Sequence, residues 1–481
     1  MSYRYPGVFM REQHMGSQPI QAESTNETAF IGIMPRGPVN KPIRITNWTQ
    51  VEEVFAKGIN DGPFMEESYL AYSLFGYYDN GGFISHVVRV VGPEAEKASA
   101  TFEEVDLPEE DFDLTIELDG DEVDEIQEVS LDPEASNFIE RVMDDNDYVE
   151  VEYDPDASNL DFTALSEGEW GNGLKIIIDE KEEELSGGDA DTDNITDTEF
   201  IDAIDTLDEV QSLDYLVVPD NQSEAVSQKI TSYATNQGDM VGILDVPEDT
   251  ESAEDVVTFR DNFNTRYGAL AYPWIRVNDP IADGSDTTRW VPLGGHYAGL
   301  ISRMHATRSV YVAPAGTDAQ IFGALELKDN IDEGKLSMLT PANVNTAMAR
   351  RNAGIVMWGA RTLSSEGKYR YLNRRTGLNF LKKTLQANSD WAVFEPHNES
   401  LWRSIEESFE SFLRTEIDKE GWTSNDPSEA FFVKCDGELN TRDYIEQGII
   451  RARVGVDIAG TGEFFEITIG QWDGGSEAQE A

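Results

Sequence analysis

Four aspartates in an acidic segment have the alternating spacing of calcium ligands. They occupy the first, third, fifth and ninth positions of an EF-hand-like pattern: Asp189, Asp191, Asp193 and Asp197. The sixth position, where such a loop needs glycine, holds Asn194, and Glu199 comes one residue before the twelfth position, which requires a bidentate glutamate. We therefore predict a solvated acidic linker and no bound metal, with these four aspartates as the alternative.

No other pattern in the sequence predicts catalysis. The five histidines include no HExxH pair, and the sequence has no GxxxxGKS/T phosphate loop and no GxGxxG after a predicted strand. The glycine-rich segments PLGGHYAGLI and VAPAGTDA lack the serine of a GxSxG nucleophile elbow. The single cysteine, Cys435, excludes an intrachain disulfide and a cysteine-based metal site, and we place it in a core strand. We predict no enzyme activity and no cofactor; the alternative is a salt-adapted α/β hydrolase with a noncanonical site.

The charge of the chain is extreme for a folded protein. There are 93 acidic and 36 basic residues, a net charge of −57, yet 39% of the residues are hydrophobic and 10% are aromatic. That apolar content is too high for a disordered acidic polymer. Molar salt shortens the Debye length to about 3 Å and removes most of the self-repulsion that a folded chain of this charge would suffer. We therefore predict the protein of a halophile.

The charge is also unevenly distributed along the chain. Residues 94–200 hold 39 acidic and 4 basic residues, whereas residues 341–460 hold 17 and 16. Nine Arg or Lys residues lie within 350–383 beside a single acid, Glu366, which predicts contact with an acidic partner. A mixture of solvated cations and ion pairs within the subunit is the alternative. Binding of nucleic acid by this stripe is a third hypothesis, which the net charge and the high working salt disfavour.

The elements expected along the chain form a mixed α/β protein. Buried strands are predicted at TAFIGIMP and GGFISHVVRV, and strands alternate with helices from residue 213 onward, which implies a parallel, helix-covered sheet. The acidic segment between these two parts alternates polar and apolar residues and is predicted to be a largely β insertion. Beyond residue 340 we expect strands at GIVMWGARTL, AVFEP, AFFVKC and IIRARVGVDI, a helix at TGLNFLKKTLQA, and an amphipathic helix capped by Asn398.

Both ends of the chain carry strand-like apolar segments. YRYPGVFM, at residues 3–10, precedes the first predicted strand of the body, and EFFEITIG follows the last, at residues 463–470. Pro6 and the polar residues after Met10 interrupt the apolar stretch that a secretory signal needs, and no run approaches the ~18 apolar residues of a membrane span. We therefore expect neither an export signal nor membrane insertion.

Segments from most of the chain resemble those of the contractile tail sheath family in order and spacing. They include YPGVFMRE, TAFIGIMPRGPVNKPIRITNW, GGFISHVVRV, AYPWIRVNDP, WVPLGGHYAGLISRMHATRSVYVAPAG, GIVMWGARTL, WAVFEPHNESLW, FLRTE, AFFVKCD and EFFEITIG. The resemblance implies a central sheet of subtilisin-like shape without a catalytic triad and a C-terminal α+β domain completed by terminal strands of neighbouring subunits. The implied parts are an arm (1–22), a first core part (23–93), an acidic outer insertion (94–204), a central domain (205–340), an inner domain (341–462) and a C-terminal strand (463–481).

The same resemblance implies a structural role. Such subunits polymerise as stacked rings of six around a tail tube and contract to drive the tube through an envelope, together with baseplate and tail terminator proteins and without membrane insertion or nucleic-acid binding. It implies an assembled sheath made in the cytoplasm of a host, here a halophile; an archaeal virus and a cell-encoded injection device both remain open. The expected intersubunit arm residues are Tyr3, Tyr5, Val8, Phe9, Phe464, Phe465, Ile467 and Ile469. The expected tube-facing residues are Arg374, Arg375, Lys382 and Lys383.

Overall fold

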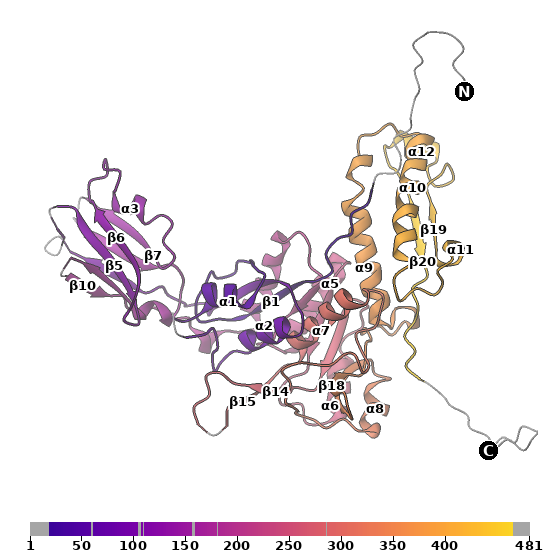
Figure 1. Ribbon diagram of the computed structural model, residues 1–481, viewed down its shortest axis with the longest axis horizontal. Coiled ribbons are helices and arrows are strands. Elements are labelled where there is room, and N and C mark those ends of the chain that lie inside the picture. Colours follow the sequence, from indigo (N-terminus) through magenta and orange to yellow (C-terminus); the bar gives the residue numbers. More distant parts are fainter. Residues whose placement is uncertain are drawn as a thin grey trace, which may run out of the picture.

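Three bodies follow one another across an elongated molecule (Figure 1). The computed structural model describes residues 19–464 except 59–60, 104–106, 109, 156–158, 180 and 285. An α/β domain lies in the middle, a β-rich insertion lies at one end of the long axis, and a helical C-terminal domain stands beside the opposite end of the central domain. The insertion and the C-terminal domain therefore lie on opposite sides of the central domain.

The central domain is built on an eight-stranded sheet with the order β18-β17-β13-β12-β11-β1-β3-β2. Six strands run parallel: β1 (Glu27–Ile33), β3 (Ile84–Val90), β11 (Tyr215–Val217), β12 (Val241–Asp245), β13 (Gly268–Tyr272) and β17 (Val344–Arg350). The edges are antiparallel: β2 (Ile43–Ile45) and β18 (Gly354–Met357). The strands read as continuous apolar runs because helices cover both faces. The predicted parallel, helix-covered sheet is therefore confirmed.

Alternate residues of the strands serve two separate cores. Phe30 packs on the face covered by the first set of helices, and its neighbours Ala29 and Ile31 pack on the other. The first set is α1 (Trp48–Phe55), α2 (Leu70–Asp79) and α7 (Gly294–Thr307). The second set is α4 (Asp197–Asp205), α5 (Glu224–Gln237), α6 (Ala253–Arg260) and α8 (Glu333–Leu339). A small sheet beside the domain consists of β14 (Ile275–Asn278), β15 (Thr288–Val291) and β16 (Glu326–Leu327).

The acidic insertion is a β domain with its own core, as the alternating pattern predicts. One sheet contains β10 (Lys181–Glu184), β9 (Leu174–Ile178), β5 (Phe112–Leu118) and β6 (Asp121–Val129). The other contains β4 (Ser99–Phe102), β8 (Asn159–Ala164) and β7 (Val149–Asp154), and α3 (Ile139–Val142) precedes β7. The two crossings to the central domain lie side by side, since Gly92 N donates to Ala190 O at 2.9 Å. The insertion thus begins and ends at one point.

Helix α4 belongs to the central domain, so the boundary predicted at residue 204 lies too late. A capping box starts this helix: the Thr196 hydroxyl accepts a backbone N–H of the first turn, and the Glu199 carboxylate accepts the Thr196 N–H. The apolar face of α4 then packs beneath β1 and β3 beside α5. The acidic composition continues into α4 because the outer face of this helix is solvated. The amino-acid composition therefore does not change at the domain boundary.

The C-terminal domain is a helical hairpin beside a two-stranded sheet. Its elements are α9 (Leu372–Ala387), α10 (Glu399–Glu416), α11 (Pro427–Ala430), α12 (Arg442–Glu446), β19 (Phe431–Lys434) and β20 (Arg453–Val456). The predicted cap of α10 is confirmed, because Asn398 Oδ1 accepts from Ser400 N at 2.9 Å. The strand predicted at AVFEP is wrong: Asp390–Ala392 is a single 3₁₀ turn, and Phe394 has a left-handed φ of 67° in the connection to α10. In the described part of the chain this segment pairs with no strand.

Candidate functional site

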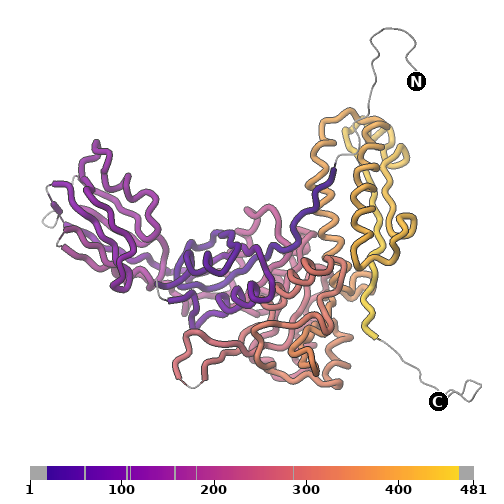
Figure 2. Tube along the Cα trace, viewed as in Figure 1, coloured from indigo at the N-terminus to yellow at the C-terminus, as the bar shows by residue number. Residues whose placement is uncertain are grey.

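The described N-terminal segment crosses from the central sheet to the C-terminal domain. It leaves β1 and lies along α9, as the indigo tube beside the orange helix in Figure 2 shows. Gln21 N donates to Asn388 Oδ1 at 2.9 Å and Asn388 Nδ2 donates back to Gln21 O at 2.8 Å, while Glu23 N donates to Thr384 Oγ1. Side-chain groups of α9 and its C-cap therefore anchor the arm at residue 21. The predicted arm residues Tyr3, Tyr5, Val8 and Phe9 lie outside the described residues.

The C-terminal segment is anchored in a comparable way. Arg361 Nε donates to Glu463 Oε1 at 2.8 Å, and both side chains are largely buried. Arg361 also donates to Asn343 Oδ1 on the loop before β17. Of the predicted C-terminal arm residues, Phe464 is described and is 84% exposed; Phe465, Ile467 and Ile469 lie outside the described residues. Local patterns could not indicate this anchor, because its two partners are 102 residues apart.

The small sheet of the C-terminal domain offers open strand edges. In the described part of the chain β19 and β20 pair only with each other, with Phe431 opposite Val456 and Lys434 opposite Arg453. Phe431 and Val433 face the core formed with α10, whereas Phe432 on the opposite face is 54% exposed. A two-stranded sheet is marginal alone, and unpaired N–H and C=O groups along its edges can accept a further strand. This sheet can therefore be extended by a strand from another chain.

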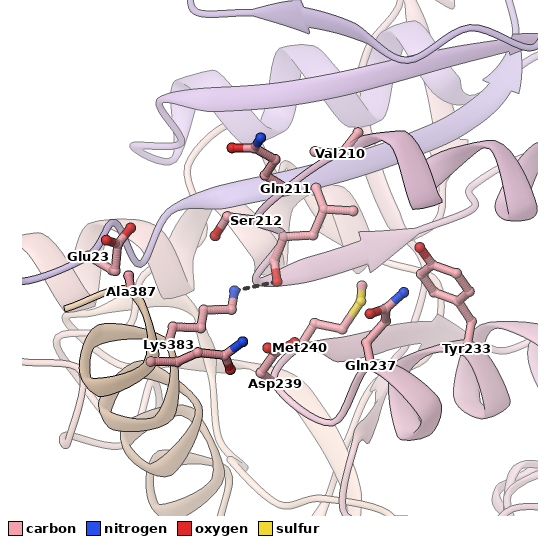
Figure 3. A pocket seen from close by; sticks show the side chains of 12 residues that line it. Glu23, Val210, Gln211, Ser212, Tyr233, Gln237, Asp239, Met240, Lys383 and Ala387 are labelled. Atoms are coloured by element: carbon pink, nitrogen blue, oxygen red, sulfur yellow. Dashed lines mark hydrogen bonds between the residues drawn. The ribbon is translucent and has the colours of Figure 1, made fainter. Parts of the chain in front are cut away.

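The structure separates the four basic residues predicted to face a partner. Lys383 is buried and pairs with Asp214 at 2.8 Å, and it also donates to Leu213 O, the bond dashed in Figure 3. Arg375 is 7% exposed and stacks on Tyr267. Since both side chains are held inside the subunit, we withdraw them as surface contacts.

The other two members of that set remain at the surface. Arg374 is half-buried and donates to Ile458 O at 3.1 Å, while Lys382 is exposed and donates to the carbonyl oxygens of Gln237 and Gly238 at 3.3 and 3.2 Å. Both therefore already bond their own chain. Their contact with a tube stays a prediction.

The ion pair between Lys383 and Asp214 joins the central and C-terminal domains. Asp214 directly precedes β11. Lys383 projects from α9 into a cleft of about 190 Å³ that Glu23, Gln237 and other residues line (Figure 3). Asp214 also accepts from Glu27 N at 3.0 Å, so one carboxylate bonds α9 and the start of β1. Burial raises the pKa of Asp214, and the Lys383 ammonium opposes this shift.

Removing one member of this pair should destabilise the subunit strongly. For Lys383→Ala we expect a loss of roughly 3–5 kcal/mol in unfolding free energy, because an uncompensated buried carboxylate remains. Asp214→Asn combined with Lys383→Met removes both charges and should cost less. Denaturant unfolding of both variants, with the exposed Lys382→Ala as the matched control, measures the difference. Equal losses in the single and double variants would contradict a paired charge.

The position at which open α/β sheets bind ligands is filled by the chain itself. The strand order reverses at β1, between β3 and β11, and ligands bind beyond the carboxyl ends of the strands at such a point. Asp220, just after β11, accepts from Ile33 N at 2.7 Å and from Ser68 Oγ at 3.0 Å, and burial raises its pKa to about 6. The Asp220 carboxylate therefore connects the end of β1 to the segment before α2.

The histidines of α7 have no catalytic partner among the described residues. His296 and His305 are buried, and desolvation lowers the pKa of each to about 4. Neither ring nitrogen of His305 has a hydrogen-bond partner in the described part of the chain. Both imidazoles are thus neutral near pH 7.

The candidate calcium aspartates are occupied by other groups. Asp191 Oδ2 accepts from Glu94 N, Asp189 Oδ1 accepts from Asp191 N, and Asp197 Oδ1 accepts from Asn221 Nδ2. Within the described ranges, no group of three or more His, Cys, Asp or Glu side chains is arranged to hold a metal ion. A search of the same ranges finds no helix with the length and hydropathy needed to span a bilayer.

Comparison with known proteins identifies the central domain. Residues 193–363 match the family model described as the phage tail sheath protein central domain. The tail sheath protein of Burkholderia phage BcepMu is 24% identical over 445 residues, covering 85% of each chain. A curated prophage major tail sheath protein of Pseudomonas aeruginosa is 26% identical over 212 residues, 43% of this chain and 52% of the relative. The tail sheath protein of Enterobacteria phage T4 is 22% identical over 290 residues, and the match spans 42% of its length.

Solved structures extend the similarity to the whole fold. The sheath complex of an extracellular contractile injection system, PVC, in the contracted state gives a TM-score of 0.64 at 16% identity and covers 98% of both chains. The crystal structure of a sheath tail protein from Desulfitobacterium hafniense gives 0.57 at 11% identity, covering 89% of this chain and 94% of the other. At such identities the likeness concerns the fold alone.

By fold, then, this is a multidomain α/β protein of the kind found in contractile sheaths. The resemblance seen in the sequence is confirmed: the chain is related to the contractile tail sheath proteins and carries their central domain at residues 193–363. The matched segments span about half or less of the length of three curated relatives.

Proposed function

We propose that this chain is the subunit of a contractile tail sheath, which polymerises around a tail tube and contracts to drive the tube through an envelope. The observation that carries the proposal is the end-to-end likeness to a sheath protein, which covers 98% of both chains. The same proposal includes stacking in rings of six, the tube, baseplate and terminator proteins as partners, and a salt-rich host.

The arrangement of the two chain ends supports this assembly. Each arm is anchored just before it leaves the described body, at Gln21 and at Glu463, and the C-terminal domain carries a two-stranded sheet with open edges. Strand addition supplies main-chain hydrogen bonds that join subunits without fixing the angle between their bodies. A polymer linked in this way can change its pitch and diameter while its subunits stay joined.

The charge distribution supports an orientation within the polymer. The insertion, which holds most of the net charge, lies at one end of the molecule, and the C-terminal domain, with 16 acidic and 11 basic residues in 372–460, lies beside the opposite end of the central domain (Figure 1). We place the insertion outside, in salt solution, and the C-terminal domain inside, against the tube. The stored energy of contraction then resides in the lattice contacts and requires no nucleotide.

Electron microscopy of the purified chain tests the proposal. In molar salt the chain is expected to form tubes or sleeves with helical order, alone or together with the tube protein from the same particle. A chain that stays monomeric under both conditions, or one that has hydrolytic activity as a monomer, would contradict the proposed function.

A further inference from the structure

A group of cations stacks on two tyrosines where the loop before β13 meets the start of α9. Arg266 Cζ lies 4.4 Å from the ring centroid of Tyr369 and 5.4 Å from that of Tyr267. Arg375 Cζ lies 4.7 Å from the Tyr267 centroid, and Lys368 Nζ lies 5.7 Å from the Tyr369 centroid. The two rings thus hold three cations together; we call these five residues the arginine–tyrosine cluster.

Arg375 is a buried cation without a counter-ion. Its side chain is more than nine-tenths buried, its Nε has no hydrogen-bond partner, and no ion pair within 4.0 Å joins it to any described carboxylate. Asp239, the acid whose charge acts on Arg375, lies instead 4.0 Å from Lys382 Nζ. Burial, and secondarily the charge of Arg266, lower the pKa of Arg375. A buried charge without a partner is costly, which points to a group missing from the isolated subunit.

The remaining cations of the cluster are also unpaired in the described part of the chain. Neither Arg266 nor Lys368 forms an ion pair or a side-chain hydrogen bond there, although the chain carries 93 acidic residues. Lys368 is exposed and Arg266 is half-buried, so both can be reached from solvent. Stacking on the tyrosines orders the cations while the guanidinium edges stay free to donate.

The start of α9 also favours the binding of an anion. Its first turn contains no acid and holds Arg374 and Arg375, so two cations lie at the positive end of the helix dipole. Helices α5 and α10 instead have an acid in the first turn, Glu224 and Glu399, whereas α7, like α9, has none. A carboxylate that pairs with Arg266 and Lys368, the two cations reachable from solvent, would also be attracted by the helix dipole and by the charge of the buried Arg375.

We propose that the arginine–tyrosine cluster is a carboxylate-binding site that receives an aspartate or glutamate side chain from a neighbouring copy of this chain in the polymer. The proposal rests on the function proposed above. A second copy is the occupant that we infer because every copy presents a strongly acidic surface and the cluster is the complementary surface. Direct bidentate pairing with arginine also persists in molar salt, where long-range attraction is screened.

Zero-length carbodiimide cross-linking of the polymer tests the occupant directly. We expect an amide between Lys368 and an acidic residue, and mass spectrometry of a polymer mixed from ¹⁴N and ¹⁵N subunits should find it in peptides of mixed isotope. Cross-links of Lys368 that occur only within one copy, or only to another protein of the particle, would overturn the proposal.

Substitution of the cations tests the strength of the site. Arg266→Gln with Lys368→Gln should raise the subunit concentration needed for polymerisation about tenfold or more, as expected for lost charge-assisted hydrogen bonds. Arg442→Gln, which removes a 90% exposed cation on α12, is the matched control. The polymerisation of the Arg375→Gln variant is interpreted only if circular dichroism shows a native fold. If the folded double variant polymerises at the same subunit concentration as the wild type, the proposed carboxylate site is wrong but the proposed function stands. If the wild-type chain forms no polymer, the proposed function is contradicted as well.

Discussion

A chain that lacks residues 1–18 is expected to fold normally and to form no ordered sheath. The described contacts of the N-terminal segment begin with Ile20, which packs on the C-terminal core, and with Gln21, which bonds Asn388. The truncation leaves in place these contacts of Ile20 and Gln21, which anchor the segment to the C-terminal domain. What it removes is the segment that we propose to pair with a neighbour, and four backbone hydrogen bonds of a short strand contribute about 2–6 kcal/mol.

Loss of one link per subunit is multiplied along a polymer, so the effect on assembly should be far larger than the effect on stability. Circular dichroism and thermal unfolding measure the fold, and electron microscopy measures helical order. The matched control keeps the length and composition of residues 1–18 but shuffles their order; it should fail to assemble if the pattern of side chains matters. Ordered sheaths from the truncated chain would contradict the arm, and an unfolded truncated monomer would show that the segment belongs to its own subunit.

Transfer from about 3 M to 0.1 M KCl is expected to unfold the insertion before the rest of the protein. Residues 94–200 hold 39 acidic residues against 4 basic ones, and Lys175, which pairs with Glu117 and Glu182, supplies two of the few ion pairs there. Near 0.1 M the Debye length grows to about 10 Å, so carboxylates on neighbouring strands repel each other across both sheets. The C-terminal domain, with 16 acidic and 11 basic residues in 372–460, should respond much less.

Trp170 provides a probe specific to the insertion. It is 2% exposed and is the one tryptophan in residues 94–200, so the difference in fluorescence between the wild type and Trp170→Phe reports on this domain. We expect the difference signal to change at higher salt than the far-ultraviolet circular dichroism of the whole chain. Sucrose at equal osmolality, which screens no charge, should not restore the domain. A Trp170 signal that stays constant across the salt range would contradict the halophilic interpretation.

Local sequence patterns were sufficient for much of the architecture. The apolar runs around Phe30 and Val87 predicted buried strands because residues on both faces of such a strand must be apolar. Asn398 and the spacing of the residues after it predicted the amphipathic helix α10 and the residue that caps its start. The acidic, alternating insertion was recognisable because solvation of one face and packing of the other produce a period of two.

Other predictions failed where distant residues decide the outcome. AVFEP has strand-forming residues, but a strand needs a partner edge, and among the described residues the connection between α9 and α10 pairs with none. Lys383 belongs to a basic stripe, but α9 turns it toward Asp214, 169 residues earlier in the chain. The Arg-Tyr pair at 266–267 and the segment KYRY at 368–371 lie in separate parts of the chain, and nothing in the sequence indicated that their rings and cations meet.

By itself the sequence determined the elements, the acidic insertion and the family resemblance, because periodicity, capping and composition act over a few residues at a time. Only the tertiary structure decided which cations are satisfied. Lys383 and Arg375 lie eight residues apart on one helix, yet one has a carboxylate at 2.8 Å and the other has none within 4.0 Å among the described residues. The difference arises from what the central domain places against each turn of α9, and electrostatic energy depends on that distance and burial rather than on residue type.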